Sequence, residues 1–235
     1  MKKLLILLFS IFISFNSYGG LFDKTVCVET DAQLRDGVIY LPNKTKPFSG
    51  KNLCKYENGQ NKSKGKVEDG KKDDIWTEWE ENGQIKFEGT YRVGQVLREK
   101  NYQNDKEIND TIFSYNENGL LEREDNYKDG KLEGSSLYQY NQNGQKELVE
   151  HYQDGNLVSR TKSTYYENGQ IKKEENYKDG KKDGKWTDWF DNGQIQFEIN
   201  HKDGKWHGSV TSWYKNGEKA MWSDWKEGVC IDGYC

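Results

Sequence analysis

The sequence predicts an all-β protein, built as an elongated repeat array of antiparallel β-hairpins in one open, twisted sheet. Three observations favour this fold: a polar but aromatic-rich composition, glycine turns at a fixed spacing, and apolar residues that alternate between the turns. Of 235 residues, 33% are hydrophobic and 31% are charged, yet 8 Trp, 15 Tyr and 9 Phe are present. Disordered chains are poor in aromatic residues, so this balance predicts a thin sheet without a deep pocket.

The N-terminus predicts an export signal. Lys2 and Lys3 precede an apolar run from Leu4 to Phe15, and Gly19 stands where a signal peptidase cleaves. The run has 12 residues, fewer than the ~20 that a membrane-spanning helix needs. We therefore expect residues 1–19 to be a signal peptide and the mature chain to be periplasmic or secreted, with membrane contact only through an uncleaved signal.

The charge of the mature chain argues against a nucleic-acid partner. Without Lys2 and Lys3, the 35 basic residues fall to 33 against 39 acidic ones, which gives a net charge of -6. A chain of this sign lacks the electrostatic footprint that binds phosphate backbones or anionic lipid. We expect neither nucleic acid nor a lipid surface as a partner.

Two interleaved sets of glycines define the repeat. The glycines of Asn-Gly pairs are Gly59, Gly83, Gly119, Gly144, Gly169, Gly193 and Gly217. A second glycine, mostly in an Asp-Gly pair, follows each of them by 11 residues: Gly70, Gly94, Gly130, Gly155, Gly180, Gly204 and Gly228. Both dipeptides favour the type I′ turn that joins antiparallel strands. Each repeat is therefore predicted to contain two short strands.

The residues between the turns alternate as strands do. Ile195 and Phe197 follow Gly193 with period two, which is the side-chain period of a strand. Four residues before all but the first Asn-Gly glycine stands an aromatic residue: Trp79, Tyr115, Tyr140, Tyr165, Trp189 and Trp213. We expect these rings to pack in ladders that replace a core. Helices are disfavoured, because a glycine turn arrives every 11 to 14 residues.

One repeat step, from Gly83 to Gly119, is 36 residues long and contains an inserted half unit near Asn104. The insert copies the Asp-Gly turn motif, with Asp105 in place of glycine. If it forms one additional strand, the turns at Gly59 and Gly83 lie at the opposite edge of the sheet from the Asn-Gly turns that follow. A bulging loop is the alternative, and it would leave all seven turns along one edge.

Several segments resemble the MORN-repeat variant of bacterial proteins. They are Tyr177 to Gly193 (YKDGKKDGKWTDWFDNG), Tyr127 to Gly134 (YKDGKLEG) and Trp213 to Gly217 (WYKNG). Asp36 to Gly59 is similar to an opening unit of that family, so the resemblance covers about Asp36 to Gly228. It implies an elongated antiparallel sheet that scaffolds partners. Many of the similar bacterial proteins carry the label of a toxin-antitoxin system YwqK family antitoxin.

The cysteines lie in two pairs, one near each end of the array. Some fifteen strands at ~4.8 Å would separate the ends by about 70 Å, whereas a disulfide joins Cα atoms only ~4.4 to 6.8 Å apart. We therefore expect disulfides from Cys27 to Cys54 and from Cys230 to Cys235, with reduced thiols as the alternative. The predicted segments are the signal peptide (1–19), an N-terminal cap and opening unit (20–50), the repeat array (51–228) and a C-terminal disulfide cap (229–235).

The sequence predicts no catalytic, cofactor-binding or metal-binding site. His151 and His201 occupy positions where other repeats have tyrosine, and a zinc site formed by His201 and His207 lacks a third ligand. No phosphate loop, nucleophile elbow or paired-histidine helix motif is present. We therefore expect a protein that is not an enzyme and that needs no cofactor.

Two functional classes follow from the aromatic residues. The first is an exported, non-enzymatic scaffold that binds a protein partner, with an antitoxin or immunity role as one case. The second is a carbohydrate-binding repeat protein of the periplasm or cell surface, because ring faces stack on sugars. In either class the same rings also hold the strands together. The candidate partner-binding residues are Trp76, Trp79, Tyr140, Tyr165, Trp186, Trp189 and Trp213.

Overall fold

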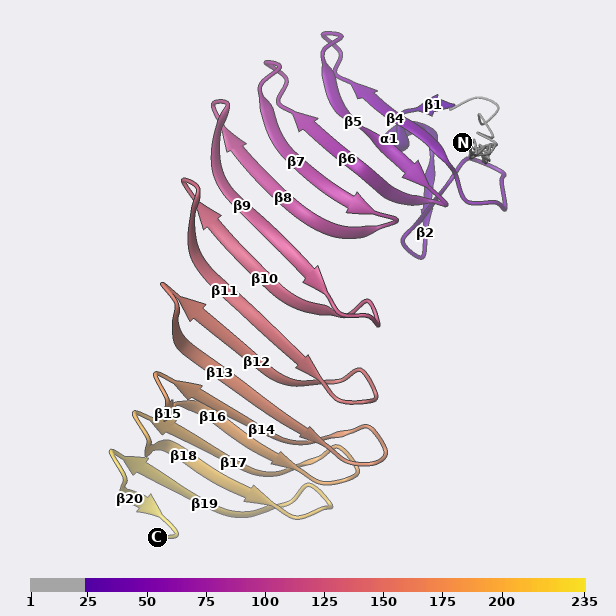
Figure 1. The fold of residues 1–235 in the computed structure, drawn as a ribbon. Helices are drawn as coiled ribbons and strands as arrows, with labels where there is room; N and C mark the ends of the chain where they lie inside the picture. The colour runs from indigo at the N-terminus through magenta and orange to yellow at the C-terminus, as the bar shows by residue number, and fades with distance from the viewer. Residues whose placement is uncertain (1–23) are drawn as a thin grey trace, which may run out of the picture.

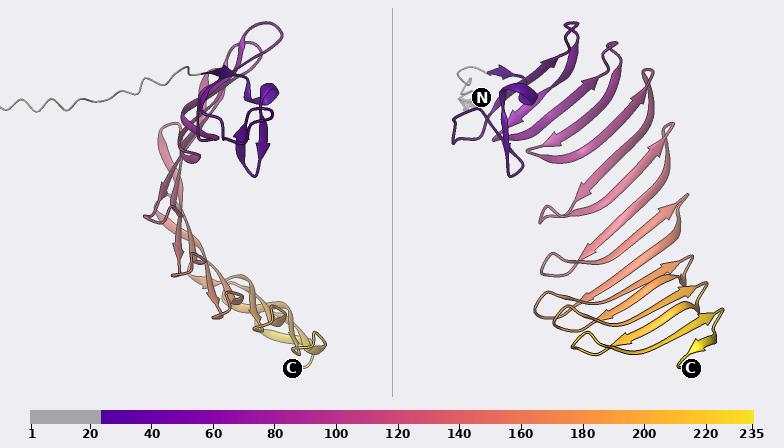
Figure 2. Two further views of the ribbon diagram at one scale, coloured as in Figure 1. Left: turned by 90° about the vertical axis from the view of Figure 1, so that its right-hand side faces the viewer. Right: turned by 180° about the vertical axis from the view of Figure 1, so that it is seen from behind.

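The computed structural model describes residues 24–235, most of which belong to one long, open β-sheet (Figure 1). Strands make up 66% of residues 24–235 and helix 2%, which confirms the all-β prediction. The predicted signal peptide, residues 1–19, lies outside the described residues. Seen edge on, the sheet is a thin layer that curves along its length, and the N-terminal segment lies against it at one end (Figure 2).

The described chain contains one short helix and twenty strands. The N-terminal segment holds β1 (Thr25–Val26), α1 (Val28–Asp31), β2 (Gln33–Arg35) and β3 (Val38–Tyr40). The strands that follow are β4 (Gly50–Lys55), β5 (Asn61–Glu68), β6 (Lys71–Trp79), β7 (Ile85–Arg92), β8 (Gln95–Gln103), β9 (Lys106–Tyr115), β10 (Leu121–Lys128), β11 (Lys131–Tyr140), β12 (Lys146–Gln153), β13 (Asn156–Tyr165), β14 (Ile171–Lys178), β15 (Lys181–Lys182), β16 (Gly184–Trp189), β17 (Ile195–Lys202), β18 (Lys205–Trp213), β19 (Lys219–Lys226) and β20 (Val229–Gly233).

The sheet follows the order of the chain. From β4 onward each strand pairs antiparallel with the next, except that β15 and β16 both pair with β14 and share one place. At the N-terminal end β1 pairs parallel with β4. The result within residues 24–235 is an open sheet of 17 strand positions. The strands β1 and β20 lie at its opposite ends (Figure 1).

The two kinds of turn differ, and only one has the predicted type. In the Asp-Gly turns both residues have positive φ, for example 49° at Asp129 and 72° at Gly130, as a type I′ turn requires. In the Asn-Gly turns only the glycine does, as at Gly169 with φ 83°. Asn168 instead accepts the backbone N–H of Gln170 through its side chain at 3.0 Å. The type I′ prediction is therefore wrong for the Asn-Gly turns, which are wider loops with glycine in the left-handed region.

The inserted half unit is a strand. The chain leaves β8, turns at Asn104 and Asp105, with φ of 53° and 58°, and enters β9, which pairs with β8 along its length. Because of this extra strand, the turns at Gly59 and Gly83 lie at one edge and the Asn-Gly turns from Gly119 onward lie at the other (Figure 1). The predicted exchange of edges is confirmed, and the bulging-loop alternative is wrong.

The extra strand exchanges the faces of the sheet as well as its edges. The extra strand reverses the direction of every later strand but keeps the order in which the strands follow one another across the sheet. This is equivalent to rotating the later part of the sheet by 180° about the line that runs across the strands. Such a rotation exchanges the two edges of the sheet and also its two faces. Trp76 and Trp186 occupy equivalent places in their repeats, yet they lie on opposite faces, which we call the Trp76 face and the Trp186 face. The Trp76 face can be followed through paired residues from Trp76 to Gly89, Glu99, Thr111, Asn126, Gly134 and, in later strands, Ser136, His151, Thr161, Glu174 and Thr187.

Residues 24–49 cover the Trp76 face of the first repeats. Val26 and Phe48 pack on Val67 and Trp76, which are 0% and 2% exposed. Gly65 makes room for this contact, because a Cβ there would lie 2.3 Å from the Trp76 ring. Burial against this segment is the main apolar core of the N-terminal half.

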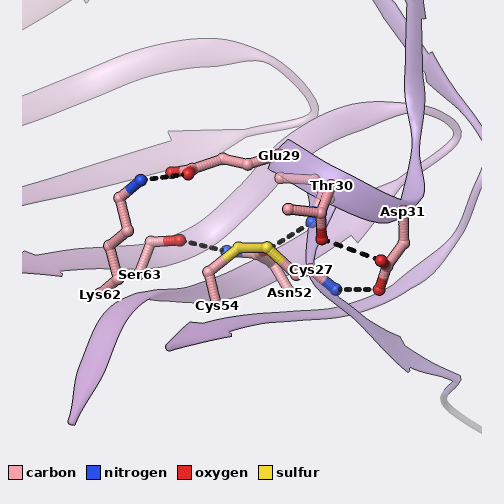
Figure 3. The surroundings of a disulfide bond; sticks show 9 residues. Cys27, Glu29, Thr30, Asp31, Asn52, Cys54, Lys62 and Ser63 are labelled. Atoms are coloured by element: carbon pink, nitrogen blue, oxygen red, sulfur yellow. Dashed lines mark hydrogen bonds and ion pairs between the residues drawn. A yellow bond between two sulfur atoms is a disulfide. The ribbon is translucent and has the colours of Figure 1, made fainter. Parts of the chain in front are cut away.

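The predicted disulfides are both present. Cys27 and Cys54 join the N-terminal segment to β4 (Figure 3). Beside them Asn52 accepts the backbone N–H of Val28 and donates to the Ser63 hydroxyl, each at 2.9 Å. At the other end Cys230 and Cys235 close a loop after β20 begins. Each terminal unit is therefore held by a covalent link, and no free cysteine occurs among residues 24–235.

The buried row of the sheet changes character along the array. In the C-terminal repeats it is apolar, with Trp186, Ile199 and Val210 on the Trp186 face. In the central strands, ion pairs occupy the same row. They are Arg98 with Asp110, Arg123 with Asp125, and Arg160 with Glu150, at 2.5 to 2.7 Å. The expectation that ring ladders replace a core throughout is therefore wrong for the middle of the array.

Candidate functional site

Four of the candidate residues form one row on the Trp76 face. Tyr140, Tyr165, Trp189 and Trp213 are the last residues of β11, β13, β16 and β18, and all four are half-buried. Each lies at the edge that carries the Asn-Gly loops, because each stands four residues before the glycine of such a loop. We call this row the aromatic strip.

The two tyrosines of the aromatic strip link neighbouring hairpins. The Tyr140 hydroxyl donates to the Leu121 carbonyl and the Tyr165 hydroxyl donates to the Lys146 carbonyl, each at 2.7 Å. Burial raises the pKa of Tyr140. Within residues 24–235, no residue accepts a hydrogen bond from the indole nitrogen of Trp189 or Trp213. The tyrosines thus have a structural task that the two tryptophan indoles do not share within the described residues.

The rings of the aromatic strip do not stack on one another. Ring contacts in the described part of the chain join Tyr177 to Trp186, Trp186 to His201, and Trp206 to Trp225. Members of the strip lie two strands apart, about 9.6 Å, whereas paired rings have centroids ~4.5 to 7 Å apart. The predicted ladder is therefore a row of separate rings, and each ring lies opposite a residue of the next strand: Lys146, Ile171, Ile195 and Lys219.

The other three candidate tryptophans lie elsewhere. Trp76 is on the same face but beneath residues 24–49, and its indole donates to the Lys66 carbonyl at 2.7 Å. Trp186 is on the opposite face and 8% exposed, with its indole donating to the Asn176 carbonyl. Trp79 is also on the Trp186 face, because the half unit separates its repeat from the later ones. The seven candidates therefore do not form one surface.

Trp186 is enclosed by charged and aromatic neighbours. The ammonium groups of Lys182 and Lys173 lie 4.0 and 5.5 Å from its ring centre, and the His201 ring lies at 4.9 Å. Burial first, and Lys182 second, lower the pKa of His201. These contacts account for Trp186 as a packing residue.

Carboxylates run beside the aromatic strip on the Trp76 face. They include Glu124, Glu174 and Glu198, which are half-buried, and Lys185 forms an ion pair with Glu198 at 2.5 Å. Glu124 accepts the Asn126 side chain at 3.2 Å. The strip thus combines ring faces with negative charge, a combination suited to a partner that carries basic residues.

The Asn-Gly loops form shallow depressions along the same edge. One of about 520 Å³ is lined by Tyr138, Tyr140 and Asn141 among others, and one of about 440 Å³ by Tyr165, Asn168 and Asp191 among others. Asn168 also donates to the Asp191 carbonyl at 2.7 Å, which clips one loop to the next.

The same clip recurs between other loops, where Asn58 donates to the Glu81 carbonyl and Asn192 donates to the Lys215 carbonyl. The sequence analysis missed these clips. A signal for them is the 23-residue separation between each asparagine and its acceptor.

Metal-ligand clusters and membrane-spanning helices are both absent from residues 24–235. No group of three His, Cys, Asp or Glu side chains within residues 24–235 could hold a metal ion. His201 and His207 each leave a buried Nδ1 without a hydrogen-bond partner, and the structure brings no third ligand to them. The described chain also has no helix of the length and apolarity that a bilayer crossing needs.

Comparison with solved structures gives only distant likeness. A TcdB2-TccC3-TEV crystal structure is 14% identical, with a TM-score of 0.38, over 83% of this chain and 11% of the other. The Photorhabdus luminescens Tc holotoxin pore is 11% identical, with a TM-score of 0.30, over 83% of this chain and 14% of the other. The chain thus spans between a tenth and a seventh of the length of those toxin chains. A porin-like protein from Bacteroides uniformis is 7% identical, with a TM-score of 0.32, over 83% and 91% of the two chains.

Sequence comparison identifies the repeat. No curated protein matches the chain. The family model described as "MORN repeat variant" matches residues 75–92, 161–179 and 182–203. Each segment contains parts of two adjacent strands and the Asn-Gly loop between them, so the matches follow the structural repeat. The chain therefore contains repeats of the MORN variant at three places on both sides of the half unit.

Proposed function

We propose that this chain is an exported, non-enzymatic repeat scaffold that binds an extended segment of a protein partner along the aromatic strip. The observation that carries the proposal is the row of four half-buried rings on one face, two of which carry indole N–H groups with no acceptor among residues 24–235. Tryptophan and tyrosine are the residues that most often dominate binding at protein interfaces. An antitoxin or immunity role would be one form of this function.

The spacing of the rings favours a particular shape of partner. Rings two strands apart repeat every ~9.6 Å, and a polyproline II segment repeats every three residues, or ~9.3 Å. A proline-rich segment would therefore place every third residue over successive rings. Its carbonyl groups, which have no internal hydrogen bonds, would accept from the indole groups of Trp189 and Trp213. Lysine or arginine in the segment would pair with Glu174, since Glu198 is already paired with Lys185.

Export of the chain is supported by the disulfides at both ends of the array, because such links form and persist in oxidising compartments. Residues 1–19 would direct this export as a signal peptide. The proposed location is therefore the periplasm or the extracellular space, where an immunity partner would also be met.

A direct test uses the mature chain and a proline-rich peptide of about 12 residues that contains lysine. Binding is followed by tryptophan fluorescence. We expect Trp189→Ala with Trp213→Ala to weaken binding at least tenfold. The matched control is Trp206→Ala, which removes a partly exposed indole from the Trp186 face and should change binding less than twofold. Equal affinity of the strip variant and the unaltered chain would reject the proposal.

Carbohydrate binding is the second candidate function. The observation in its favour is the pair of depressions between the Asn-Gly loops, where a tyrosine lies beside asparagine and carboxylate side chains that could bond sugar hydroxyls. A parallel titration with cello- and chito-oligosaccharides separates the two functions. Sugar binding that is lost in Tyr140→Ala, without any peptide binding, would support this second function in place of the first.

A further inference from the structure

A second exposed surface lies on the opposite face and in the other half of the array. On the Trp186 face of β4–β6, a depression of about 490 Å³ is lined by Leu53, Ile75 and Trp79, with Lys51 and Lys64 at its rim. Leu53 pairs with Lys64 and Lys64 with Thr77, so these side chains share the face. The N-terminal segment covers the other side of these strands, and Thr25 is its one described residue that lines the depression. We call this surface the lysine-rimmed patch.

The half unit explains why this surface exists. Trp79 is the counterpart of Trp189 and Trp213 in the repeat, since each stands four residues before an Asn-Gly glycine. The exchange of faces places Trp79 on the side away from the aromatic strip. A partner on the lysine-rimmed patch therefore does not compete for space with a partner on the strip.

The patch has an apolar floor that nothing in the described chain covers. Ile75 is 57% exposed, although it stands in the middle of a strand and next to the buried Trp76. Leu53 and Trp79 are half-buried beside it. An apolar side chain of a partner would remove this surface from water.

The stretch of chain that contains β4 and most of β5 is basic, whereas the rest of the chain is acidic. Residues 43–66 hold seven lysines and one glutamate, a net charge of +6, whereas the remaining 28 basic and 38 acidic residues sum to -10. Lys51, Lys55 and Lys64 are exposed on the face of the patch. The ammonium of Lys66 is already held by Asp73 and Glu68, at 2.8 and 3.0 Å, and the exposed Asp74 also lines the depression. Lys55 and Lys64 therefore supply the positive charge on which the proposal depends.

We propose that the lysine-rimmed patch is a second docking surface, which binds an acidic segment with alternating apolar residues from a partner protein. The apolar side chains fill the depression over Ile75 and Leu53, and the carboxylates pair with the surrounding lysines. The chain then acts as an adaptor, with one partner on each face. This inference concerns a different surface from the aromatic strip and does not require a partner there.

The test is a calorimetric titration of the mature chain with a 12-residue peptide of alternating leucine and glutamate. We expect binding that weakens as salt is raised, because the contacts are exposed ion pairs. Ile75→Glu with Lys64→Glu should weaken binding at least tenfold. The matched control, Leu132→Glu with Lys131→Glu, makes the same kinds of change in β11 outside the patch and should alter affinity less than twofold.

Three further arms make the result decisive. The variant Trp189→Ala with Trp213→Ala should bind the acidic peptide normally, so a failure of the aromatic strip leaves this proposal standing. The proposal would be overturned if a peptide of alternating leucine and lysine bound as tightly as the acidic peptide. It would also be overturned if the variant Ile75→Glu with Lys64→Glu bound the acidic peptide as tightly as the unaltered chain. Binding to phosphatidylserine vesicles without binding to the acidic peptide would assign the patch to a lipid surface and would also overturn it. Circular dichroism of each variant confirms that the sheet is intact.

Discussion

The ion pair between Arg98 and Asp110 should stabilise the inserted half unit. It joins β8 to β9 through two hydrogen bonds, from Nε to Oδ1 at 2.8 Å and from a terminal nitrogen to Oδ2 at 2.5 Å. The Asp110 side chain is 7% exposed and that of Arg98 is 45% exposed. Replacing Arg98 with methionine keeps most of its apolar stem but leaves a buried carboxylate without its main partner.

The size of the effect follows from that burial. Breaking a buried pair costs about 3 to 5 kcal/mol, whereas a surface pair contributes about 0 to 1 kcal/mol. Because one partner is buried and the other is half in water, we expect Arg98→Met to destabilise β8–β9 by about 2 kcal/mol. Replacing both partners, as Arg98→Met with Asp110→Leu, should recover most of this loss, since no charge is then left buried.

Hydrogen exchange of the β8 and β9 amides measures the loss of stability in these two strands. A local measurement is necessary because repeat arrays need not unfold in one step. A loss of about 2 kcal/mol corresponds to roughly 30-fold faster exchange. As a control, Lys106→Met removes an exposed pair with Asp129 and should change exchange less than threefold. If the double variant exchanges as fast as Arg98→Met, the buried charge is not the cause and the reasoning is refuted.

Three other outcomes are expected. The hydrogen bonds from Arg98 hold the pKa of Asp110 below its usual value. The stabilisation that ionised Asp110 gives to the folded state is therefore complete above about pH 4 and declines as pH falls through the folded-state pKa. Amide hydrogen exchange in Arg98→Met should show less of this acid dependence. Val93→Asn should raise the free energy of unfolding by about 1 kcal/mol, because valine is strained at φ 44°. The urea midpoint should rise accordingly, and an unchanged midpoint would contradict this. Removing the Cys27–Cys54 disulfide, which spans 27 residues, should destabilise the first repeats by about 3.5 kcal/mol. Removing the Cys230–Cys235 disulfide, which spans five residues, should destabilise the last repeats by about 2 kcal/mol. The difference arises because a disulfide that closes a longer loop removes more conformational entropy from the unfolded chain. Equal effects on hydrogen exchange at both ends would contradict this reasoning.

The sequence contains enough information to predict the order of strands. Glycine turns at fixed spacing require short strands joined in sequence, and the position of Asp105 marks the additional strand. The disulfides follow from the same order, since an open sheet brings together only cysteines near the same end. These features depend on local conformation and chain connectivity, which a sequence pattern records directly.

Features that depend on register and packing could not be predicted in the same way. The opposite faces of Trp76 and Trp186 follow from the extra strand only if that strand pairs with both of its neighbours, and this depends on the observed register. Residues 24–35 lie before the repeat, and the resemblance to an opening unit from Asp36 onward does not indicate that Phe48 and Val26 would cover Trp76. The ion pair of Arg98 with Asp110 likewise joins residues of different strands, whose alignment the turn positions leave open by one or two residues.

The exchange of edges and faces by the half unit is the central claim, and a distance across it is the most direct test. Spin labels at Glu81 and Glu117 occupy the loops before and after the insert. Nine residues of β8 at ~3.3 Å and three strand steps at ~4.8 Å separate these loops by about 33 Å. Labels at Glu81 and Gln103, at the same edge, should be about 10 Å apart and serve as the reference. Electron paramagnetic resonance that places Glu81 and Glu117 about 33 Å apart would agree with two reversed sub-arrays, and a separation near 10 Å would contradict the account.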